Sequence, residues 1–304
     1  MPSTIPKKTC IIVAGPTAVG KTSVSIALAQ HFKTDIISAD SRQCYKELNI
    51  GVAKPSADQL QQVKHYFINS HSITEDVNAG VFEQYALRAV NEIFVSHDIA
   101  IMVGGTGLYI RAFCDGMDDI PAASADLRDE ISIKYEQVGL DWLQNEIKKK
   151  DPAWYVSGEI QNPQRMMRAL EVVMATGKSI LEFRTEKKVQ RDFDIIKIGL
   201  TLPRAQLYGQ IDARVDEMIK DGLEDEVRSL LKYRKLNALQ TVGYKEMFEY
   251  FDGVITRETA ISHIKRNTRH YAKRQLTWFA KDAAIEWFSP LDQNQLIKSL
   301  QNLV

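Results

Sequence analysis

At 304 residues the chain is long enough for one large domain or two modest ones, and its 39 lysine and arginine residues balance its 39 aspartate and glutamate residues. The overall charge therefore indicates no nucleic-acid or membrane partner, and such a signal has to come from a local cluster. Three cysteines without metal-type spacing, Cys10, Cys44 and Cys114, argue against a zinc site and fit free thiols in a reducing compartment.

The first predicted element is a buried strand at residues 10–15 (CIIVAG), a short apolar run that ends in glycine. This run is too short for a signal peptide or a membrane-spanning helix, so we expect a cytoplasmic protein with no membrane partner. After a glycine-rich turn, residues 22–32 show helical spacing of apolar side chains through Val24, Ala27, Leu28 and Phe32. Strand, glycine loop and helix in this order are the context that a phosphate-binding loop requires.

Strands and helices alternate along most of the remaining chain. Further strands are predicted at residues 35–38, 65–69, 99–104, 195–202 and 285–288, and helices lie between them, for example at residues 81–96 and 204–219. This alternation predicts an α/β fold, with a mostly parallel sheet and helices on both of its faces.

The alternation breaks after Cys114. From about residue 126 to residue 176 the pattern is helical throughout, and charged or Gly/Pro-containing stretches lead into and out of it. We therefore predict an all-helical insertion at residues 116–194. It separates two halves of one α/β core, at residues 1–115 and 195–304.

The segment GPTAVGKT matches the pattern GxxxxGK[ST] of phosphate-binding loops. Backbone N–H groups of such a loop converge on phosphate oxygens, and the helix that follows adds its positive N-terminal end. Lys21 is expected to reach a terminal phosphate and the Thr22 hydroxyl to hold Mg²⁺. A glycine turn that merely joins strand and helix is the weaker explanation of so complete a match. The predicted phosphate-binding residues are Gly15, Pro16, Thr17, Ala18, Val19, Gly20, Lys21 and Thr22.

The loop alone does not identify a nucleotide, because any organic diphosphate would satisfy the same donors. An NTPase also needs an acidic residue that ends a second strand and helps to hold Mg²⁺. The strand at residues 99–104 instead runs into Gly104, Gly105 and Thr106, which leaves Asp40, after the strand at residues 35–38, as the other candidate. Three roles stay open for Asp40: a Mg²⁺ ligand of a small-molecule kinase, a general base, or the N-cap of a helix.

Residues 259–281 form a predicted helix that carries six cations on one arc, with His270 among them, and no Asp or Glu. The opposite arc is expected to pack on the core through Ile261, Ile264, Tyr271, Trp278 and Phe279. A neutral protein that concentrates cations on one helix face is expected to meet a polyanion such as an RNA backbone. The alternative is a solvated face whose cations have partners elsewhere in the fold. The cations are Lys265, Arg266, Arg269, Lys273, Arg274 and Lys281, of which Lys265, Arg269 and Lys273 are the predicted RNA contacts.

Six segments together resemble one known family. In chain order they are GPTAVGKT, DSRQCYKELNIGVAKP, VGGTGLYI, NPQRMMRALEV, QTVGYKE and TRHYAKRQLTWF. They span nearly the whole chain, and DSRQCY and GGTGLY are especially distinctive. On these motifs the chain resembles the tRNA dimethylallyltransferases of the bacterial type, which are also called tRNA isopentenyltransferases.

The resemblance implies a P-loop NTPase-like fold and a reaction. Members of the family transfer the dimethylallyl group of dimethylallyl diphosphate to the exocyclic N6 of an adenosine beside the anticodon of tRNA. The implied partners are the tRNA anticodon stem-loop and dimethylallyl diphosphate, and the implied cofactor is Mg²⁺. The glycine loop would then hold a diphosphate that leaves as pyrophosphate. No water has to be activated at phosphorus, which fits the missing hydrolytic carboxylate.

Carried over position by position, the resemblance makes Asp40 the general base and places Arg214 on the diphosphate opposite Lys21. Without the resemblance, a surface ion pair of Arg214 with Asp216 or Glu217 is the simpler expectation. The positions that match tRNA contacts of the family are Asp40, Ser41, Arg42, Gln43, Thr106, Arg128, Gln164, Arg165, Met166, Met167 and Arg168.

Other functions stay open on the sequence. A small-molecule kinase would use ATP in the same loop, but it gives no reason for the basic helix. Relatives that prenylate free adenine nucleotides share the glycine loop. An RNA-binding GTPase or ATPase switch needs base-recognition and hydrolysis motifs, and none is visible in the sequence. We expect a monomer, because tRNA contacts should occupy much of the surface.

Overall fold

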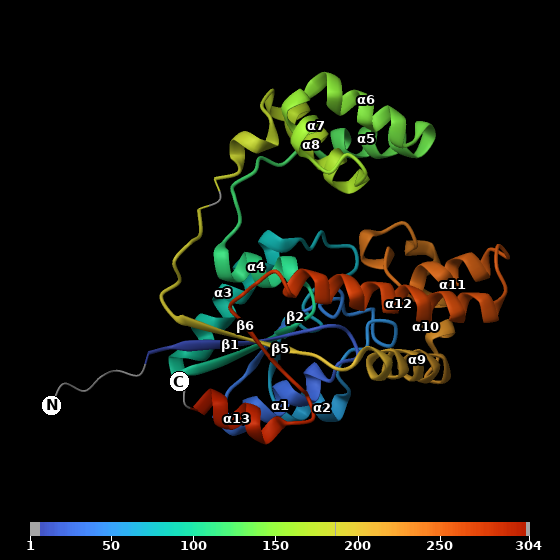
Figure 1. Cartoon of the computed structure of the whole chain (residues 1–304). Helices are drawn as coiled ribbons and strands as arrows, with labels where there is room; N and C mark the ends of the chain where they lie inside the picture. Colours follow the sequence, from blue (N-terminus) through green and yellow to red (C-terminus); the bar gives the residue numbers. More distant parts are fainter. Residues whose placement is uncertain (1–6, 186, 302–304) are drawn as a thin grey trace. The chain divides into compact units, whose positions relative to one another are not determined.

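The computed structural model describes residues 7–185 and 187–301 and divides the chain into two compact units (Figure 1). The first unit comprises Met1–Asp115 and Gln190–Val304, and the second is Gly116–Val189. The second unit ends earlier than the predicted boundary at residue 194. The reason is Arg191, whose guanidinium donates to the carbonyls of Phe113 and Ala112 and pairs with Glu83, so the chain already belongs to the first unit there.

Six parallel strands form one sheet in the described part of the first unit, in the order β3–β2–β4–β1–β5–β6. The central strand β1 pairs with β4 on one side and with β5 on the other. The predicted parallel α/β architecture is confirmed. The strands are β1 (Thr9–Ala14), β2 (Ile36–Ala39), β3 (His65–Tyr66), β4 (Ile99–Gly104), β5 (Asp194–Leu200) and β6 (Ile285–Phe288).

Strand β3 is shorter than the predicted strand at residues 65–69. Phe67 and Asn69 adopt φ angles of 62° and 53°, in the left-handed region that a strand does not use. The chain therefore turns away from the sheet after Tyr66, and Phe67 packs in the core as part of a turn.

Both faces of the sheet are covered, as the continuous apolar runs of its strands require. Successive residues of β1 point to opposite faces: Cys10 and Ile12 belong to one apolar cluster, and Ile11 and Val13 to another. The first cluster includes side chains of α3 and α4, and the second includes side chains of α1 and α13. Figure 1 shows α1 and α13 on one side of the sheet and α3 and α4 on the other.

The four helices predicted in the first unit correspond to α1, α3, α9 and α12, whose ends lie within two residues of the predicted ones, whereas no bounds were predicted from the sequence for α2, α4, α10, α11 and α13. No helix among the described residues is both long enough and apolar enough to cross a bilayer. The α-helices are α1 (Lys21–Phe32), α2 (Ala57–Gln62), α3 (Ala79–Ser96), α4 (Gly107–Asp115), α9 (Arg204–Lys220), α10 (Leu223–Ser229), α11 (Tyr244–Phe251), α12 (Arg257–Phe279) and α13 (Gln293–Gln301), and the 3₁₀ turns are η2 (Leu231–Tyr233) and η3 (Asn237–Leu239).

The described residues of the second unit are helical where they form regular structure, as the sequence predicts. The helices pack around an apolar cluster of their own, which includes Ile131, Leu143, Trp154, Met166 and Leu170. The elements are α5 (Ala125–Val138), α6 (Leu140–Lys150), α7 (Pro152–Ser157), α8 (Pro163–Thr176) and the 3₁₀ turn η1 (Ile180–Phe183).

Candidate active site

The glycine-rich loop joins β1 to α1 at the carboxyl end of the central strand. Gly15 has a φ of 148°, and a Cβ there would lie 2.8 Å from the carbonyl oxygen of Leu200, so no side chain fits. Helix α1 begins at Lys21 after Gly20, with no side-chain cap and no acidic residue in its first turn. The first backbone N–H groups of an uncapped helix have no intrahelical acceptors. The loop therefore presents a site for an anion.

Lys21 is the cation of this loop. Its Nζ donates to the carbonyl of Pro16 at 2.7 Å. Burial lowers the pKa of Lys21 to about 7, and the neighbouring Asp40 only partly opposes this effect. An ammonium group that is this costly to bury favours an anionic ligand beside it, because a nearby opposite charge stabilises the protonated form.

Two more side chains converge on Thr17 in the same loop. Arg214 of α9 donates from Nη1 to the Thr17 hydroxyl at 3.3 Å. Gln275 of α12 accepts from the Thr17 N–H at 2.8 Å and donates to the carbonyl of Gly105 at 2.9 Å. The loop is thus fixed by α9 and α12, and it meets the end of β4 through a single amide side chain. Sequence reasoning missed Gln275, although a polar residue on the apolar arc of a helix is a detectable signal.

Asp40 lies directly after β2. Its Oδ1 accepts from the N–H groups of Arg42 at 2.8 Å and Gln43 at 3.2 Å, which holds the carboxylate in a turn and not at the start of a helix. In the part of the chain that the structure describes, no hydrogen bond reaches Oδ2. Thr106 braces the same turn, since its hydroxyl accepts from the N–H of Ser41 at 3.1 Å. Asp40 therefore keeps one oriented oxygen for another group.

Two cavities meet at Asp40. The first, of about 840 Å³, is lined by Lys21 and Thr22 of the loop, and the second, of about 780 Å³, by Arg266 and Arg274 of α12. Both are in the first unit. The residues that line both cavities are Thr17, Asp40, Val52, Ala53, Arg214, Met218 and Tyr271. The Asp40 carboxylate therefore lies between the hydrogen-bond donors of the phosphate-binding loop, in the first cavity, and the cationic side chains that line the second cavity.

Tyr271 stands at this junction and was predicted to pack on the core. It is half-buried, and burial and the nearby Asp40 raise its pKa far above the ordinary value. The phenol therefore stays protonated near the carboxylate and is available as a hydrogen-bond donor.

Glu226 of α10 positions the segment that closes this junction. Its carboxylate accepts from the N–H groups of Asn49, Ile50 and Gly51 at 2.8–3.0 Å and from the hydroxyl of the buried Tyr244 at 2.6 Å. The next residues, 52 and 53, offer their carbonyls to the side-chain amide of Gln43, three residues from Asp40. A residue 177 positions away in sequence thus fixes the wall of both cavities.

Glu226→Gln should lower the free energy of unfolding by about 2 kcal/mol, because a neutral amide oxygen cannot replace a carboxylate that accepts four hydrogen bonds. Glu224→Gln on the same helix is the matched control: Glu224 pairs with Arg257 near the surface and should cost less than about 1 kcal/mol. Urea denaturation of both variants measures the difference. Equal losses would mean that Glu226 contributes no more than a surface ion pair.

The basic helix is partly neutralised by α9. Lys265 pairs with Asp216 at 2.6 Å, and Arg269 pairs with Asp212 at 2.7 Å. The two ion pairs lie about one helical turn apart and link α12 to α9. For these two cations the solvated-face alternative, with partners elsewhere in the fold, describes the structure better than free RNA contacts. Asp216 is therefore engaged by Lys265, and Arg214 is directed to Thr17. The exposed cations of α12 and the residues just after it are Arg266, Lys273, Arg274 and Lys281.

The apolar arc of α12 is buried in part only. Ile264 and Phe279 lie in the core as predicted. The prediction for Trp278 is wrong, because 38% of this residue is exposed. Its indole lies against Gly107 at the start of α4, at the edge of the apolar arc, where the helix emerges from the core.

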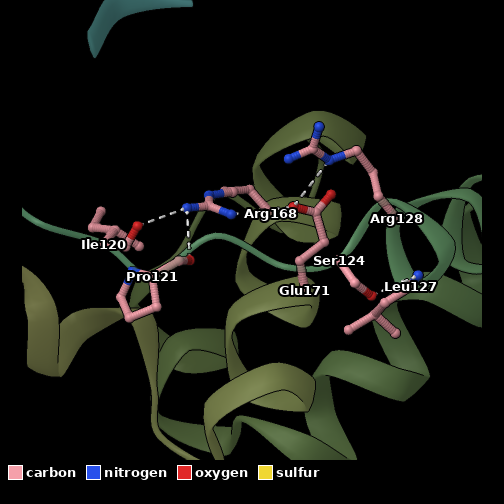
Figure 2. Close-up of polar contacts among 7 residues, drawn as sticks. All are labelled: Ile120, Pro121, Ser124, Leu127, Arg128, Arg168 and Glu171. Atoms are coloured by element: carbon pink, nitrogen blue, oxygen red, sulfur yellow. Dashed lines mark hydrogen bonds and ion pairs between the residues drawn. The ribbon is translucent and has the colours of Figure 1, made fainter. Parts of the chain in front are cut away.

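Two of the predicted contact residues of the second unit, Arg128 and Arg168, lie beside Glu171 (Figure 2). The side chain of Glu171 is almost buried and pairs with Arg168 at 3.2 Å and with Arg128 at 3.8 Å. Arg168 also donates to the carbonyls of Ile120 and Pro121. The two arginines are thus brought together from α5 and α8 by one carboxylate, and Figure 2 shows both guanidinium groups beside it.

The QRMMR segment divides between surface and core. Gln164 and Arg165 are exposed, and Arg165 pairs with Glu159. Met166 and Met167 are buried in the apolar cluster of the second unit, so their side chains do not present an RNA-binding surface as predicted. The reason is that α8 turns these positions inward, onto the same face as Leu170.

Comparison with known proteins places this site in context. The model of the IPP transferase family matches residues 43–282. The chain is 48% identical to the tRNA dimethylallyltransferase of Cytophaga hutchinsonii, over 93% of each chain, and 46% identical to tRNA dimethylallyltransferase 1 of Bacteroides thetaiotaomicron, over 97% of this chain and 96% of the other.

Solved structures show the same similarity. The full-length tRNA isopentenylpyrophosphate transferase of Bacillus halodurans has a TM-score of 0.71 and 36% identity, over 98% of this chain and 95% of that chain. A eukaryotic dimethylallyltransferase acting on tRNA has a TM-score of 0.76 and 28% identity, over 95% of this chain and 75% of that chain.

Proposed function

The chain belongs to the IPP transferase family and is an enzyme that prenylates tRNA, and we propose that it transfers the dimethylallyl group of dimethylallyl diphosphate to the exocyclic N6 of an adenosine beside the anticodon, with release of pyrophosphate. The observation that carries the proposal is the meeting of two cavities at Asp40, one lined by the phosphate-binding loop and the other open toward α12. A diphosphate and an adenosine can then approach one another from opposite sides.

Asp40 suits the removal of a proton from the attacking amine. The N6 amino group of adenine is a poor nucleophile, because its lone pair is delocalised into the ring. It becomes competent when a base takes its proton as the C–N bond forms, and an ionised carboxylate is an acceptor only. The proton goes to the free Oδ2 of Asp40, the C–O bond to the diphosphate breaks, and the electron pair leaves with pyrophosphate.

Positive charge stabilises the leaving diphosphate. Lys21 and the uncapped N-terminus of α1 contact it from the loop, and Arg214 reaches it from α9, next to Thr17. The target adenosine has to leave the stacked anticodon loop to enter the second cavity, as enzymes that modify bases require.

Mg²⁺ fits this site only as an ion held mainly by the diphosphate. No group of three or more His, Cys, Asp or Glu side chains that could hold a metal occurs among the described residues. Mg²⁺ commonly keeps several waters and takes substrate phosphates with one or two protein ligands, so the half-buried Thr22 hydroxyl suffices on the protein side. When bound, the ion supplies further neutralisation of the leaving diphosphate.

The direct test is transfer of label from dimethylallyl diphosphate. The protein is incubated with radiolabelled dimethylallyl diphosphate and unmodified tRNA, in the absence of ATP, and label is measured in RNA and in free adenine nucleotides. We expect label in RNA. Label confined to AMP, ADP or ATP would point to an adenine-nucleotide prenyltransferase, and phosphate transfer from added ATP to a small molecule would point to a kinase.

Charge reversal tests whether the exposed cations of α12 that have no ion-pair partner on α9 contribute to RNA binding. Lys273→Glu with Arg274→Glu should weaken binding of the anticodon stem-loop and reduce the salt dependence of its affinity by a slope of about 1 to 2, because both side chains are exposed. The matched control is Lys33→Glu with Lys298→Glu, two exposed lysines at the end of α1 and on α13. A salt slope equal to that of the control would show that this face does not meet RNA.

A further inference from the structure

An exposed indole lies among the free cations of α12. Trp278 keeps 38% of its surface exposed although it sits on a helix whose neighbouring Phe279 is buried. The ring rests on the start of α4, where a Cβ on Gly107 would lie 2.1 Å from the indole Nε1. The absence of a side chain at Gly107 therefore gives the ring a fixed seat against backbone, while part of it remains accessible.

The surroundings of this indole are cationic. Trp278 lines a shallow cavity of about 420 Å³ on the outside of α12, whose lining as far as the structure describes it is His270, Lys273, Arg274, Thr277, Trp278 and Lys281, without a carboxylate. His270 and Arg274 also line the second cavity of the active site. The indole is therefore next to the opening through which the proposed function brings the adenosine.

The chemistry of the patch favours RNA over a protein partner. Lysine is depleted in protein–protein interfaces, and three long cations with a histidine around one aromatic ring would leave several charges to be paired by the partner. Single-stranded nucleic acid offers both complements at once, since its phosphates pair with the cations and its bases stack on the ring.

We propose that Trp278 is the stacking platform for an unpaired base of the anticodon loop that flanks the target adenosine. This inference rests on the proposed function, because it names the RNA contact made just outside the opening of the second cavity. Stacking a flanking base on Trp278 holds the loop open after the adenosine has left its stack, while Lys273 and Lys281 contact phosphates on either side.

The protein variants measure the contact. Base–aromatic stacking is worth enough that Trp278→Leu should weaken binding of the anticodon stem-loop roughly tenfold to a hundredfold. Trp278→Phe keeps a ring and should recover much of the loss. Leu291→Ala is the matched control, since Leu291 is an exposed apolar side chain that does not line this cavity, and it should bind as the wild type does. Binding of dimethylallyl diphosphate should be the same in all of these proteins.

The RNA variants keep the protein intact and identify the stacked base. A series of stem-loops carries one abasic nucleotide at each unpaired position other than the target adenosine. One flanking abasic position should weaken binding to the wild type about tenfold and change binding to Trp278→Leu little. If every abasic position weakens both proteins equally, or if Trp278→Leu binds like the wild type, the ring stacks on no base and the inference is wrong.

Failure of the inference and failure of the proposed function give different results. Wild-type protein that puts no label from dimethylallyl diphosphate into intact tRNA contradicts the proposed function. Wild-type protein that labels tRNA, with kcat/KM unchanged in Trp278→Leu, contradicts the stacking platform alone.

Discussion

Asp40→Asn should lower the rate of prenyl transfer roughly 10²- to 10⁴-fold, the range that a positioned general base contributes. Asparagine keeps the size of the side chain, and its carbonyl oxygen can still accept from the N–H groups of Arg42 and Gln43, so the turn after β2 should persist. What is lost is the second carboxylate oxygen, which takes the proton from N6 in the proposed reaction. Single-turnover kinetics with saturating tRNA and dimethylallyl diphosphate measure the chemical step directly.

Binding measurements on the same variant decide between the roles that the sequence leaves open for Asp40. Affinity for tRNA should stay within a few-fold of the wild type, and affinity for the diphosphate should not weaken. Asp221→Asn is the matched control, because Asp221 lines the first cavity away from the junction. If Asp40→Asn instead abolishes binding of the diphosphate or of Mg²⁺, while the rate of the chemical step in the bound complex stays normal, Asp40 is a metal ligand. The general-base role would then be excluded.

Lys21→Met should lower the rate of transfer roughly 10²- to 10³-fold, as the loss of one preorganised charge at a developing anion does. Charge accumulates on the diphosphate as its bond to carbon breaks. In the proposed reaction Lys21 therefore contributes more to the transition state than to the bound substrate, and kcat should fall together with kcat/KM. Methionine retains the length and apolar stem of lysine, so the packing of the loop is largely preserved.

Steady-state kinetics distinguish this role from simple attraction of the substrate. Ser23→Ala is the control within the same turn of α1, since its hydroxyl donates only to the carbonyl of Gly20 and carries no charge. It should stay within a few-fold of the wild type. A Lys21→Met variant with normal kcat and a raised KM would show that Lys21 binds the ground state and the transition state equally.

Elements with a strong local pattern could be predicted from the sequence. Three such patterns depend only on neighbouring residues: the apolar run before Gly15, the helical spacing after Thr22 and the break in alternation after Cys114. They correspond to β1, to α1 and to the separate helical unit. The strand β3 was predicted, but its end was placed three residues too late, because that end is set by the backbone conformation of Phe67 and Asn69, which carries no apolar signal.

Contacts between distant segments could not be predicted. Arg269 contacts Asp212, which is 57 positions away in sequence, and Thr17 contacts Gln275, which is 258 positions away. Such long separations produce no pattern in the local spacing of residues. The charges of α12 therefore read as one uniform basic face in sequence, although the fold has already neutralised two of them. For the same reason, Glu226 carried no sign of its four hydrogen bonds.

The amide of Gln275 has a thermodynamic consequence. Helix α12 presents its exposed cations on one side, and through Gln275 it holds the N–H of Thr17 and the carbonyl of Gly105 on the other. In the proposed reaction, ordering of this helix by RNA is conveyed by the same amide to the loop that binds the diphosphate. Linkage requires the exchange to be mutual: the factor by which tRNA changes the affinity for diphosphate equals the factor by which diphosphate changes the affinity for tRNA. The coupling through this one side chain is therefore the same whichever of the two substrates binds first.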